Sequence, residues 1–227
     1  EYSLDSVLPF IRQTAGPRTI IIPILNIYGT GARVQKELPD CTVLDGCIYV
    51  SASLEHPGVL VQHGPILRVV FGSRNPSYIS PILSAIQSDL CESGIDGVLS
   101  THIQRDALEK FSYVSPIGAA GVYLHAVAGD FQKEGAAREL FKSMIREIST
   151  LAAAMGYPFE KDYVKINLEI LSNLSADATT SMQRDIMEGK PSELDGLVME
   201  PLRLAKKYSV SMPCYEEVAN ALCPLEF

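Results

Sequence analysis

Lys110 is the side chain of this sequence best placed for acid chemistry, because it interrupts the apolar side of a predicted helix. A helix over residues 102–118 would align one apolar stripe with Lys110 inside it, made of Ile103, Ala107, Phe111, Val114 and Ile117. A lysine in such a stripe either extends its ammonium group to the edge of a cleft or serves a function. Because loss of hydration lowers the pKa of an amine, a lysine at a cleft edge suits work as a general acid. Periodicity alone leaves both possibilities open.

Ser181 is a second candidate, at the start of a short predicted helix. The order Thr180-Ser181-Met182-Gln183 matches a capping box, so we expect Thr180 to be the N-cap and Gly189 to end the helix. The Ser181 hydroxyl and the free N–H groups of a first helical turn could bind a carboxylate. A serine at this position is also explained by cap formation alone.

Two acidic residues stand at the start of the next predicted helix, in Ser192-Glu193-Leu194-Asp195. The helix dipole favours acids in a first turn, so it accounts for Glu193 and Asp195 without any catalytic role. Pro201 predicts a kink or break near Glu200, because proline cannot donate a helical hydrogen bond.

Asn26 is a further candidate, because it follows a predicted buried strand over residues 18–25. Ligands of open α/β sheets meet residues just beyond the carboxyl ends of strands, although an asparagine there is usually a turn former. The nearby Gly29-Thr30-Gly31 lacks the third glycine of a dinucleotide fingerprint, so we expect a loop there rather than a pyrophosphate cradle.

The elements that must position these residues divide near residue 100. Residues 1–100 predict an α/β part: the buried strand, then short strands with the character of an antiparallel extension (42–44, 47–51, 59–62 and 67–71), a helix over 81–91 and another short strand. Residues 101–227 predict only helices, including 136–155 and 161–171. The fold class expected is therefore α/β plus all-α.

Composition excludes several classes of protein. The 227 residues are 47% hydrophobic and carry a net charge of −8 without a basic stripe, which argues against a nucleic-acid partner. No apolar run approaches a membrane span, and the N-terminus lacks a signal peptide, so we expect a cytoplasmic protein. The five cysteines and four histidines lack CxxC, HxxxH or HExxH spacing, so neither a disulfide framework nor a metal site is expected.

Taken together, these features resemble the ketopantoate reductase (2-dehydropantoate 2-reductase) family over residues 18–215. The shared motifs are Leu25-Asn26, Gly46-Cys47-Ile48-Tyr49-Val50-Ser51-Ala52, His56-Pro57-Gly58-Val59, Val70-Phe71-Gly72, Ile103-Gln104, Glu109-Lys110-Phe111, Thr180-Ser181-Met182-Gln183-Arg184-Asp185 and Gly189-Lys190-Pro191-Ser192-Glu193-Leu194-Asp195. The last two of these motifs are the most specific.

The resemblance implies a Rossmann-like sheet that binds NADPH, followed by a helical substrate and dimerisation domain of the 6-phosphogluconate dehydrogenase type. It implies reduction of a small 2-keto acid, foremost 2-dehydropantoate to pantoate in pantothenate biosynthesis, in a possible homodimer. By position, Lys110 matches the proton-donating lysine and Ser181 the serine at the substrate carboxylate. Glu193 matches a glutamate in the cleft between cofactor and substrate, and Asn26 an asparagine near the nicotinamide that is expected to contact the substrate as well.

The sequence also departs from the family pattern. Val114 and Gly118 stand where the family usually has asparagines after the lysine, and Ile27-Tyr28 separates Asn26 from Gly29. The family's glycine-rich loop and first βαβ units would precede Glu1, so we expect residues 1–100 to be the C-terminal part of an incomplete Rossmann domain. The alternatives are a reductase of another 2-keto acid, a non-catalytic NADP-binding protein on the same fold, and a dehydrogenase of the wider 6-phosphogluconate or opine type.

Overall fold

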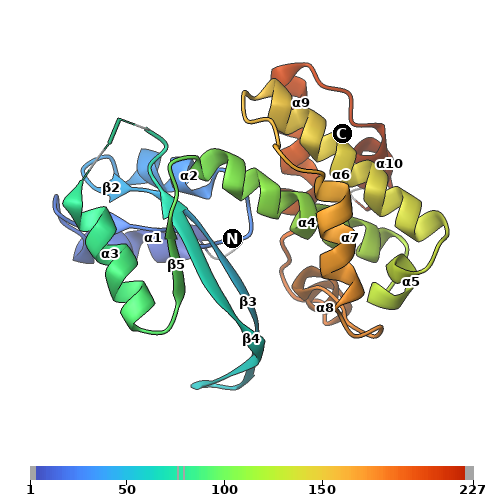
Figure 1. Ribbon diagram of the computed structural model, residues 1–227, viewed down its shortest axis with the longest axis horizontal. Coiled ribbons are helices and arrows are strands. Elements are labelled where there is room, and N and C mark those ends of the chain that lie inside the picture. The colour runs from blue at the N-terminus through green and yellow to red at the C-terminus, as the bar shows by residue number, and fades with distance from the viewer. Residues whose placement is uncertain (1–3, 76, 79, 223–227) are drawn as a thin grey trace. The chain divides into compact units, whose positions relative to one another are not determined.

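A computed structural model describes residues 4–75, 77–78 and 80–222, which form two compact units that divide between Ala107 and Leu108. The first unit holds helices with a two-stranded parallel sheet and a three-stranded mixed sheet, and the second holds helices alone (Figure 1). The expected order of an α/β part before a helical part is therefore confirmed. The division between the units lies inside a helix, beyond the predicted boundary near residue 100.

The sheet unit joins a short parallel pair of strands to an antiparallel hairpin. Its elements are α1 (Leu4–Thr14), β1 (Ile20–Ile21), α2 (Thr30–Glu37), β2 (Thr42–Val43), β3 (Asp45–His56), β4 (Val59–Gly72), α3 (Pro81–Glu92) and β5 (Asp96–Leu99). β1 runs parallel to β2, and the Leu44 N–H extends that ladder by donating to the Ile21 carbonyl at 2.9 Å. The chain then enters β3, which is antiparallel to β4, and β4 is parallel to β5.

The predicted strand over residues 18–25 was too long. β1 contains only Ile20–Ile21, and both residues are half-buried rather than covered on both faces. Pro23 has no N–H for a ladder, so strand pairing cannot continue through it. Asn26 consequently follows an irregular segment and not the end of a strand.

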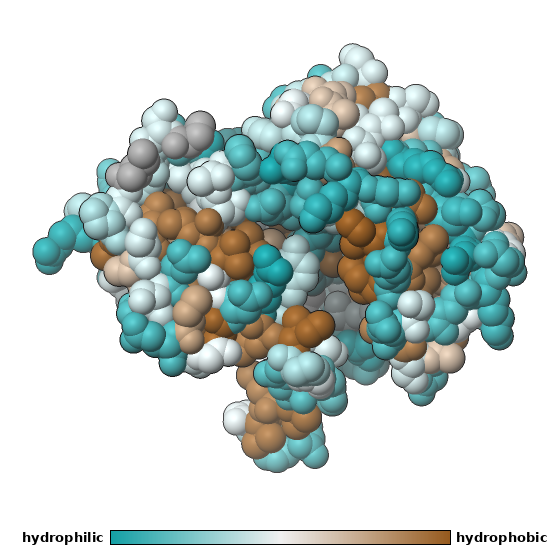
Figure 2. Space-filling model, viewed as in Figure 1, coloured by the Kyte–Doolittle hydropathy of each residue, from teal (hydrophilic) through white to brown (hydrophobic). Residues whose placement is uncertain are grey.

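The strands predicted over 47–51, 59–62 and 67–71 merge into one long hairpin, β3 and β4. Gly58, with φ +87°, makes the turn, and register shifts lie between Val50 and Ala52 and between Leu54 and His56. The far end of the hairpin carries exposed apolar side chains, visible as brown surface in Figure 2, including Leu54, Leu60 and Ile66 at 64%, 74% and 63% exposure.

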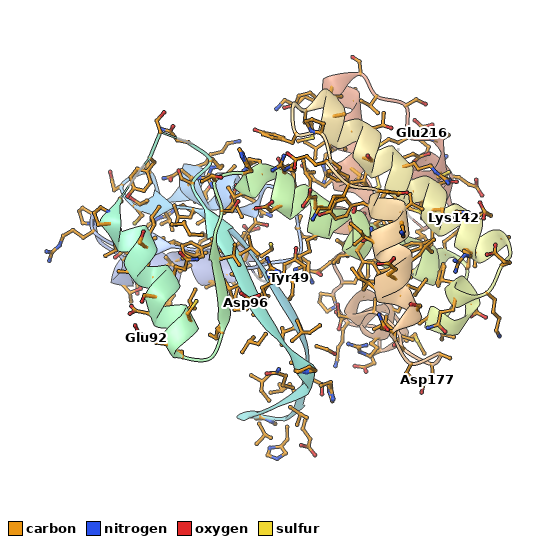
Figure 3. All side chains as sticks on the ribbon, in the orientation of Figure 1. Tyr49, Glu92, Asp96, Lys142, Asp177 and Glu216 are labelled. Carbon is orange, nitrogen blue, oxygen red and sulfur yellow. The ribbon has the colours of Figure 1, made fainter. Side chains whose placement is uncertain are left out.

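The two faces of the sheet bury alternate residues of β4. Val69 and Phe71 pack with Leu44 and with Leu83 of α3, whereas Val70 packs on the other face with Cys47 and Ile103. The chain reverses tightly between Glu92 and Asp96, at the end of α3 and the start of β5 (Figure 3), through Gly94 with φ +80°. Because Ile103 is the first residue of the helix that follows β5, its contact with Val70 and Cys47 anchors the start of that helix against the sheet.

In the second unit, several helices pack against one face of α6. The elements of this unit are α4 (Ile103–Tyr123, which starts in the sheet unit), α5 (Ala128–Gln132), α6 (Ala136–Ala154), α7 (Tyr163–Ser172), α8 (Ser181–Met187), the π-helical turn η1 (Asp195–Met199), α9 (Glu200–Tyr208) and α10 (Pro213–Leu222). α6 buries an apolar stripe completely, made of Phe141, Met144, Ile145, Ile148 and Leu151. No helix within the described ranges combines the length and apolar character needed to cross a membrane.

α4 continues past its predicted end at Gly118, although Pro116 lies inside it. Proline cannot donate to the carbonyl four residues earlier, which here belongs to Ser112. The buried side chain of Asn167 on α7 donates to that carbonyl instead, at 3.1 Å. A tertiary contact thus replaces the hydrogen bond that the helix lacks.

Candidate active site

Lys110 is half-buried on α4, and the apolar stripe predicted around it is buried only in part. Ile103, Phe111 and Ile117 are almost fully buried, whereas Lys110 and Val114 are half-buried. Lys110 therefore combines an apolar setting with partial exposure, which is the arrangement that the proposed acid chemistry needs.

The predicted capping box at the start of α8 is confirmed. The Thr180 Oγ1 accepts from the Gln183 N–H at 3.2 Å, and the Gln183 Oε1 accepts from the Thr180 N–H at 2.9 Å. Ser181 is the first residue of α8 and is exposed, and the helix ends before Gly189, which has φ +65°. The cap fixes the backbone of Ser181 and leaves its side chain open to solvent.

α8 packs closely on α4 because two glycines of α4 leave room for it. A Cβ added to Gly118 would lie 3.1 Å from Met182 Cε, and one added to Gly121 would lie 2.8 Å from the Gln183 amide. The Gln183 Nε2 also donates to the Ala126 carbonyl at 2.7 Å. The buried side chain of Gln183, which was not among the predicted site residues, thus packs on Gly121 of α4 and bonds to the segment that follows this helix.

Glu193 and Asp195 have different surroundings at the next helix start. Glu193 is half-buried, and its carbonyl accepts from the Leu197 N–H at 2.8 Å. Asp195 binds Arg203 with both oxygens, at 2.9 and 2.7 Å. The disturbance predicted near Glu200 takes the form of a change from the π-helical η1 to α9, and the helix is not broken, because Met199 and Glu200 keep helical backbone angles.

The loop predicted at Gly29-Thr30-Gly31 is instead the start of α2, with Gly29 as its N-cap in a left-handed conformation (φ +83°) and Thr30 and Gly31 in the first turn. A Cβ on Gly31 would lie 1.9 Å from Asp45 Oδ1 and 2.4 Å from the Leu44 carbonyl. Gly31 is therefore needed for the approach of α2 to β3. The Cβ side of Gly31 is filled by this chain's own carboxylate, so a ligand cannot occupy that side of the residue.

Asp45 is the centre of a buried polar network that sequence reasoning missed. Its carboxylate accepts from Arg74 Nη1 at 2.7 Å and from the Gln104 amide, and the Tyr28 hydroxyl donates to Gln104 Oε1 at 2.5 Å. Burial raises the pKa of Asp45, against the lowering effects of Arg74 and Gln104. The sequence signal that could have indicated this network was Asp45 itself, an acidic residue between the apolar Leu44 and the strand predicted over residues 47–51.

The candidate residues are distributed over both units. Lys110, Ser181 and Glu193 belong to the helical unit, and α4 and α8 are in contact there. Asn26 belongs to the sheet unit and is half-buried. Within residues 4–75, 77–78 and 80–222, no three histidine, cysteine or acidic side chains gather as a metal site.

Two curated relatives match nearly the whole chain. The uncharacterized oxidoreductase YkpB of Bacillus subtilis (strain 168) is 24% identical over 96% of this chain and 71% of its own length. The 2-dehydropantoate 2-reductase of Nostoc sp. (strain PCC 7120) is 22% identical over 92% of this chain. The chain spans 66% of that second relative, just under two thirds.

Solved structures share the fold at low sequence identity. The 2-dehydropantoate 2-reductase from Geobacter metallireducens GS-15 has a TM-score of 0.88 at 20% identity, over 97% of this chain and 73% of that one. A ternary structure of D-mandelate dehydrogenase with NADH and anilino(oxo)acetate has a TM-score of 0.84 at 19% identity, over 97% of this chain and 72% of that one. These likenesses establish a Rossmann-like sheet domain with a helical C-terminal domain.

Two family models cover most of the sequence. The model described as ketopantoate reductase PanE/ApbA matches residues 1–76, and the one described as ketopantoate reductase PanE/ApbA C terminal matches residues 102–226. Since the second match alone covers more than half of the 227 residues, the chain belongs to the ketopantoate reductase PanE/ApbA family, a family of oxidoreductases.

Proposed function

We propose that the protein reduces the keto group of a small 2-keto acid to a hydroxyl group, with Lys110 as the general acid. The observation that carries this proposal is the half-buried position of Lys110 within the apolar stripe of α4, at the place of the family's proton donor. As hydride reaches C2, negative charge develops on the keto oxygen. A proton from the Lys110 Nζ neutralises that charge and completes the 2-hydroxy acid.

Three further residues receive roles by their match to the family motifs. Ser181, exposed on the capped start of α8, contacts the substrate at its carboxylate end. Glu193 forms hydrogen bonds toward cofactor and substrate, and Asn26 lies at the nicotinamide. The packing of Gln183 on Gly121 supports the pairing of Ser181 with Lys110, because it places α8 against the helix that carries the lysine.

The proposed cofactor is NADPH, which supplies the hydride when bound. The structurally similar D-mandelate dehydrogenase was solved with NADH, which supports a nicotinamide dinucleotide in general. Because Gly31 is packed against Asp45, we assign no residue of the Gly29-Thr30-Gly31 segment to the pyrophosphate. Only Asn26 and Glu193 are assigned to the cofactor.

The first candidate substrate is 2-dehydropantoate, after which the Nostoc relative is named. A second candidate is another 2-keto acid of similar size. The apolar residues Val114 and Gly118, one and two turns beyond Lys110, favour this second candidate.

The test is NADPH oxidation by the full-length gene product with 2-dehydropantoate and a panel of other 2-keto acids. Lys110→Ala should lower kcat by about 10²- to 10⁴-fold, the usual contribution of a general acid. The exposed Lys206 on α9 provides the control, and Lys206→Ala should leave kcat unchanged. If Lys110→Ala keeps most of the rate, the assigned role is wrong. Tight NADPH binding without turnover of any keto acid would instead identify a non-catalytic protein.

A further inference from the structure

The part of α4 beyond Lys110 contains three side chains able to form hydrogen bonds over residues 111–121: Ser112, Tyr113 and Ser115. If any of them pointed toward a ligand beside Lys110, that ligand could carry a polar group there. The contacts of each one therefore decide what kind of substrate fits along this helix.

Ser112 is fully buried and faces α7. Its hydroxyl donates to the Glu109 carbonyl at 2.7 Å and accepts from the Asn167 amide at 3.1 Å. Both functions of the hydroxyl are used within the protein, so Ser112 offers a ligand nothing.

Ser115 is also fully buried and faces η1 and α10. Its hydroxyl lies 2.6 Å from the Leu197 carbonyl and 2.5 Å from the Tyr215 hydroxyl, which is itself buried. Ser115 therefore belongs to an internal network of the helical unit.

Tyr113 points its ring toward α6. The ring packs edge-on against the fully buried Phe141, with centroids 6.0 Å apart. The hydroxyl oxygen is buried and has no hydrogen-bond partner among the described residues. A substrate cannot reach an oxygen in this position.

The face of α4 that carries Lys110 continues with apolar residues. Val114 lies one turn on and is half-buried, and Gly118 lies two turns on. The side chains nearest to the Cβ direction of Gly118 are those of Met182 and Leu197, at 3.1 and 3.7 Å. Because Met182 and Leu197 are themselves buried, the half-buried Val114 is the side chain on this face that a ligand beside Lys110 would meet next.

We infer that the substrate is a 2-keto acid whose chain along α4 is a compact apolar group without a hydroxyl. The inference rests on the proposed function, because it assumes that the keto group lies at Lys110. A substrate hydroxyl placed against Val114 would lose its hydration without gaining a partner. Such a site rejects an added hydroxyl by about 10²-fold at most, a modest preference compared with that of a site built to bind the hydroxyl.

A matched pair of substrates tests the inference. The compound 3,3-dimethyl-2-oxobutanoate has the carbon skeleton of 2-dehydropantoate and lacks only its hydroxyl. For the full-length gene product, kcat/KM should be about 10- to 100-fold higher for 3,3-dimethyl-2-oxobutanoate. A kcat/KM that is equal, or higher for 2-dehydropantoate, would overturn the inference and leave the proposed reductase function standing. Absence of turnover on every 2-keto acid would overturn both.

A substitution at Val114 connects this preference to α4. Val114→Asn adds an amide one turn from Lys110 and should shift the ratio of the two kcat/KM values toward 2-dehydropantoate by about tenfold. Val114→Ala, the control, shortens the side chain without adding a polar group, so it should change both values alike and keep the ratio. Unfolding midpoints of both variants verify that they fold. An unchanged ratio in folded Val114→Asn would contradict the assignment of this face to the substrate.

Discussion

The hydroxyl of Ser115 on α4 donates a 2.6 Å hydrogen bond to the backbone carbonyl of Leu197 in η1. That carbonyl lies four residues before Pro201, which has no N–H to donate to it. Asn167 has the same relationship to the Ser112 carbonyl, four residues before Pro116. In both places a side chain from another helix supplies the donor that a proline lacks, and the two contacts join α4 to its neighbours.

Replacement of Ser115 by alanine should therefore lower the free energy of unfolding by about 1–3 kcal/mol, because it leaves buried polar groups unpaired. The cost should be smaller in a Pro201→Ala background, where the backbone N–H of residue 201 can donate to Leu197. Denaturant unfolding of both single variants and the double variant measures the difference.

The control for Ser115 is Ser172→Ala on α7. The Ser172 hydroxyl also bonds to a helix carbonyl, that of Glu169 at 2.8 Å, but it is exposed, so its removal should change stability by no more than about 0.5 kcal/mol. Equal costs of Ser115→Ala in the two backgrounds would show that the hydroxyl does not replace the missing proline donor.

Gly121→Ala should destabilise the helical unit by about 1–3 kcal/mol. The new methyl group would lie 2.8 Å from the Gln183 amide, which cannot move away because the Ala126 carbonyl and the Thr180 N–H hold its end. In a Gln183→Ala background the space is vacant, and the same change at Gly121 should cost little.

Thermal or denaturant unfolding of these three variants measures the coupling. If the costs of Gly121→Ala and Gln183→Ala simply add, the contact between α4 and α8 is looser than the structure indicates. Steady-state kinetics of Gln183→Ala would then separate a local role at Ser181 from a general loss of stability.

Tyr113→Phe should stabilise the protein near neutral pH by about 1 kcal/mol, since it removes a buried hydroxyl that has no hydrogen-bond partner in the described part of the chain. Tyr123→Phe is the control. Its hydroxyl donates to Glu217 at 2.9 Å at the surface, so loss of that bond should cost little. A clear loss of stability in Tyr113→Phe would indicate that the Tyr113 hydroxyl has a partner after all.

The same tyrosine gives a prediction at alkaline pH. Burial raises the pKa of Tyr113 from its ordinary value near 10 to about 12, so the unfolded chain releases the phenol proton first. Stability contributed by the protonated phenol is complete below pH 10 and is lost as pH rises toward 12, by about 3 kcal/mol in total. The advantage of Tyr113→Phe over the wild type should grow across that interval. A constant advantage would contradict the raised pKa.

Local signals predicted the elements that depend on neighbours in sequence. The capping box of Thr180 and Gln183 and the helix end at Gly189 involve residues a few positions apart, and both are confirmed. The disturbance that Pro201 predicted takes the form of a π-helical turn rather than a break. The length of β1 depended instead on pairing with β2 and on Pro23, and the apolar run alone suggested a longer strand. The hairpin likewise extends beyond its apolar segments because β3 and β4 pair with each other.

The candidate site shows the same difference between local patterns, which the sequence predicts, and long-range contacts, which it does not. Helical periodicity placed Lys110 within the stripe, since the residues concerned lie on one helix. Ser115 and Leu197 are 82 positions apart, and Asn167 and Ser112 are 55 apart, so no local pattern could pair them. Pro116 lies inside the helix predicted over residues 102–118, but its local pattern does not identify Asn167 as the donor to the Ser112 carbonyl. The roles of Lys110, Ser181, Glu193 and Asn26 stay predictions.

The close packing around Gly31 has a consequence for how this sequence can diverge. Any side chain at that position would collide with Asp45 and Arg74, and loss of the Asp45 carboxylate would leave Arg74 and Gln104 without their shared acceptor. None of these residues can change alone at small cost. We expect the glycine, the acid and the arginine to be inherited as a set, so that descendants of this sequence keep all three or replace them together.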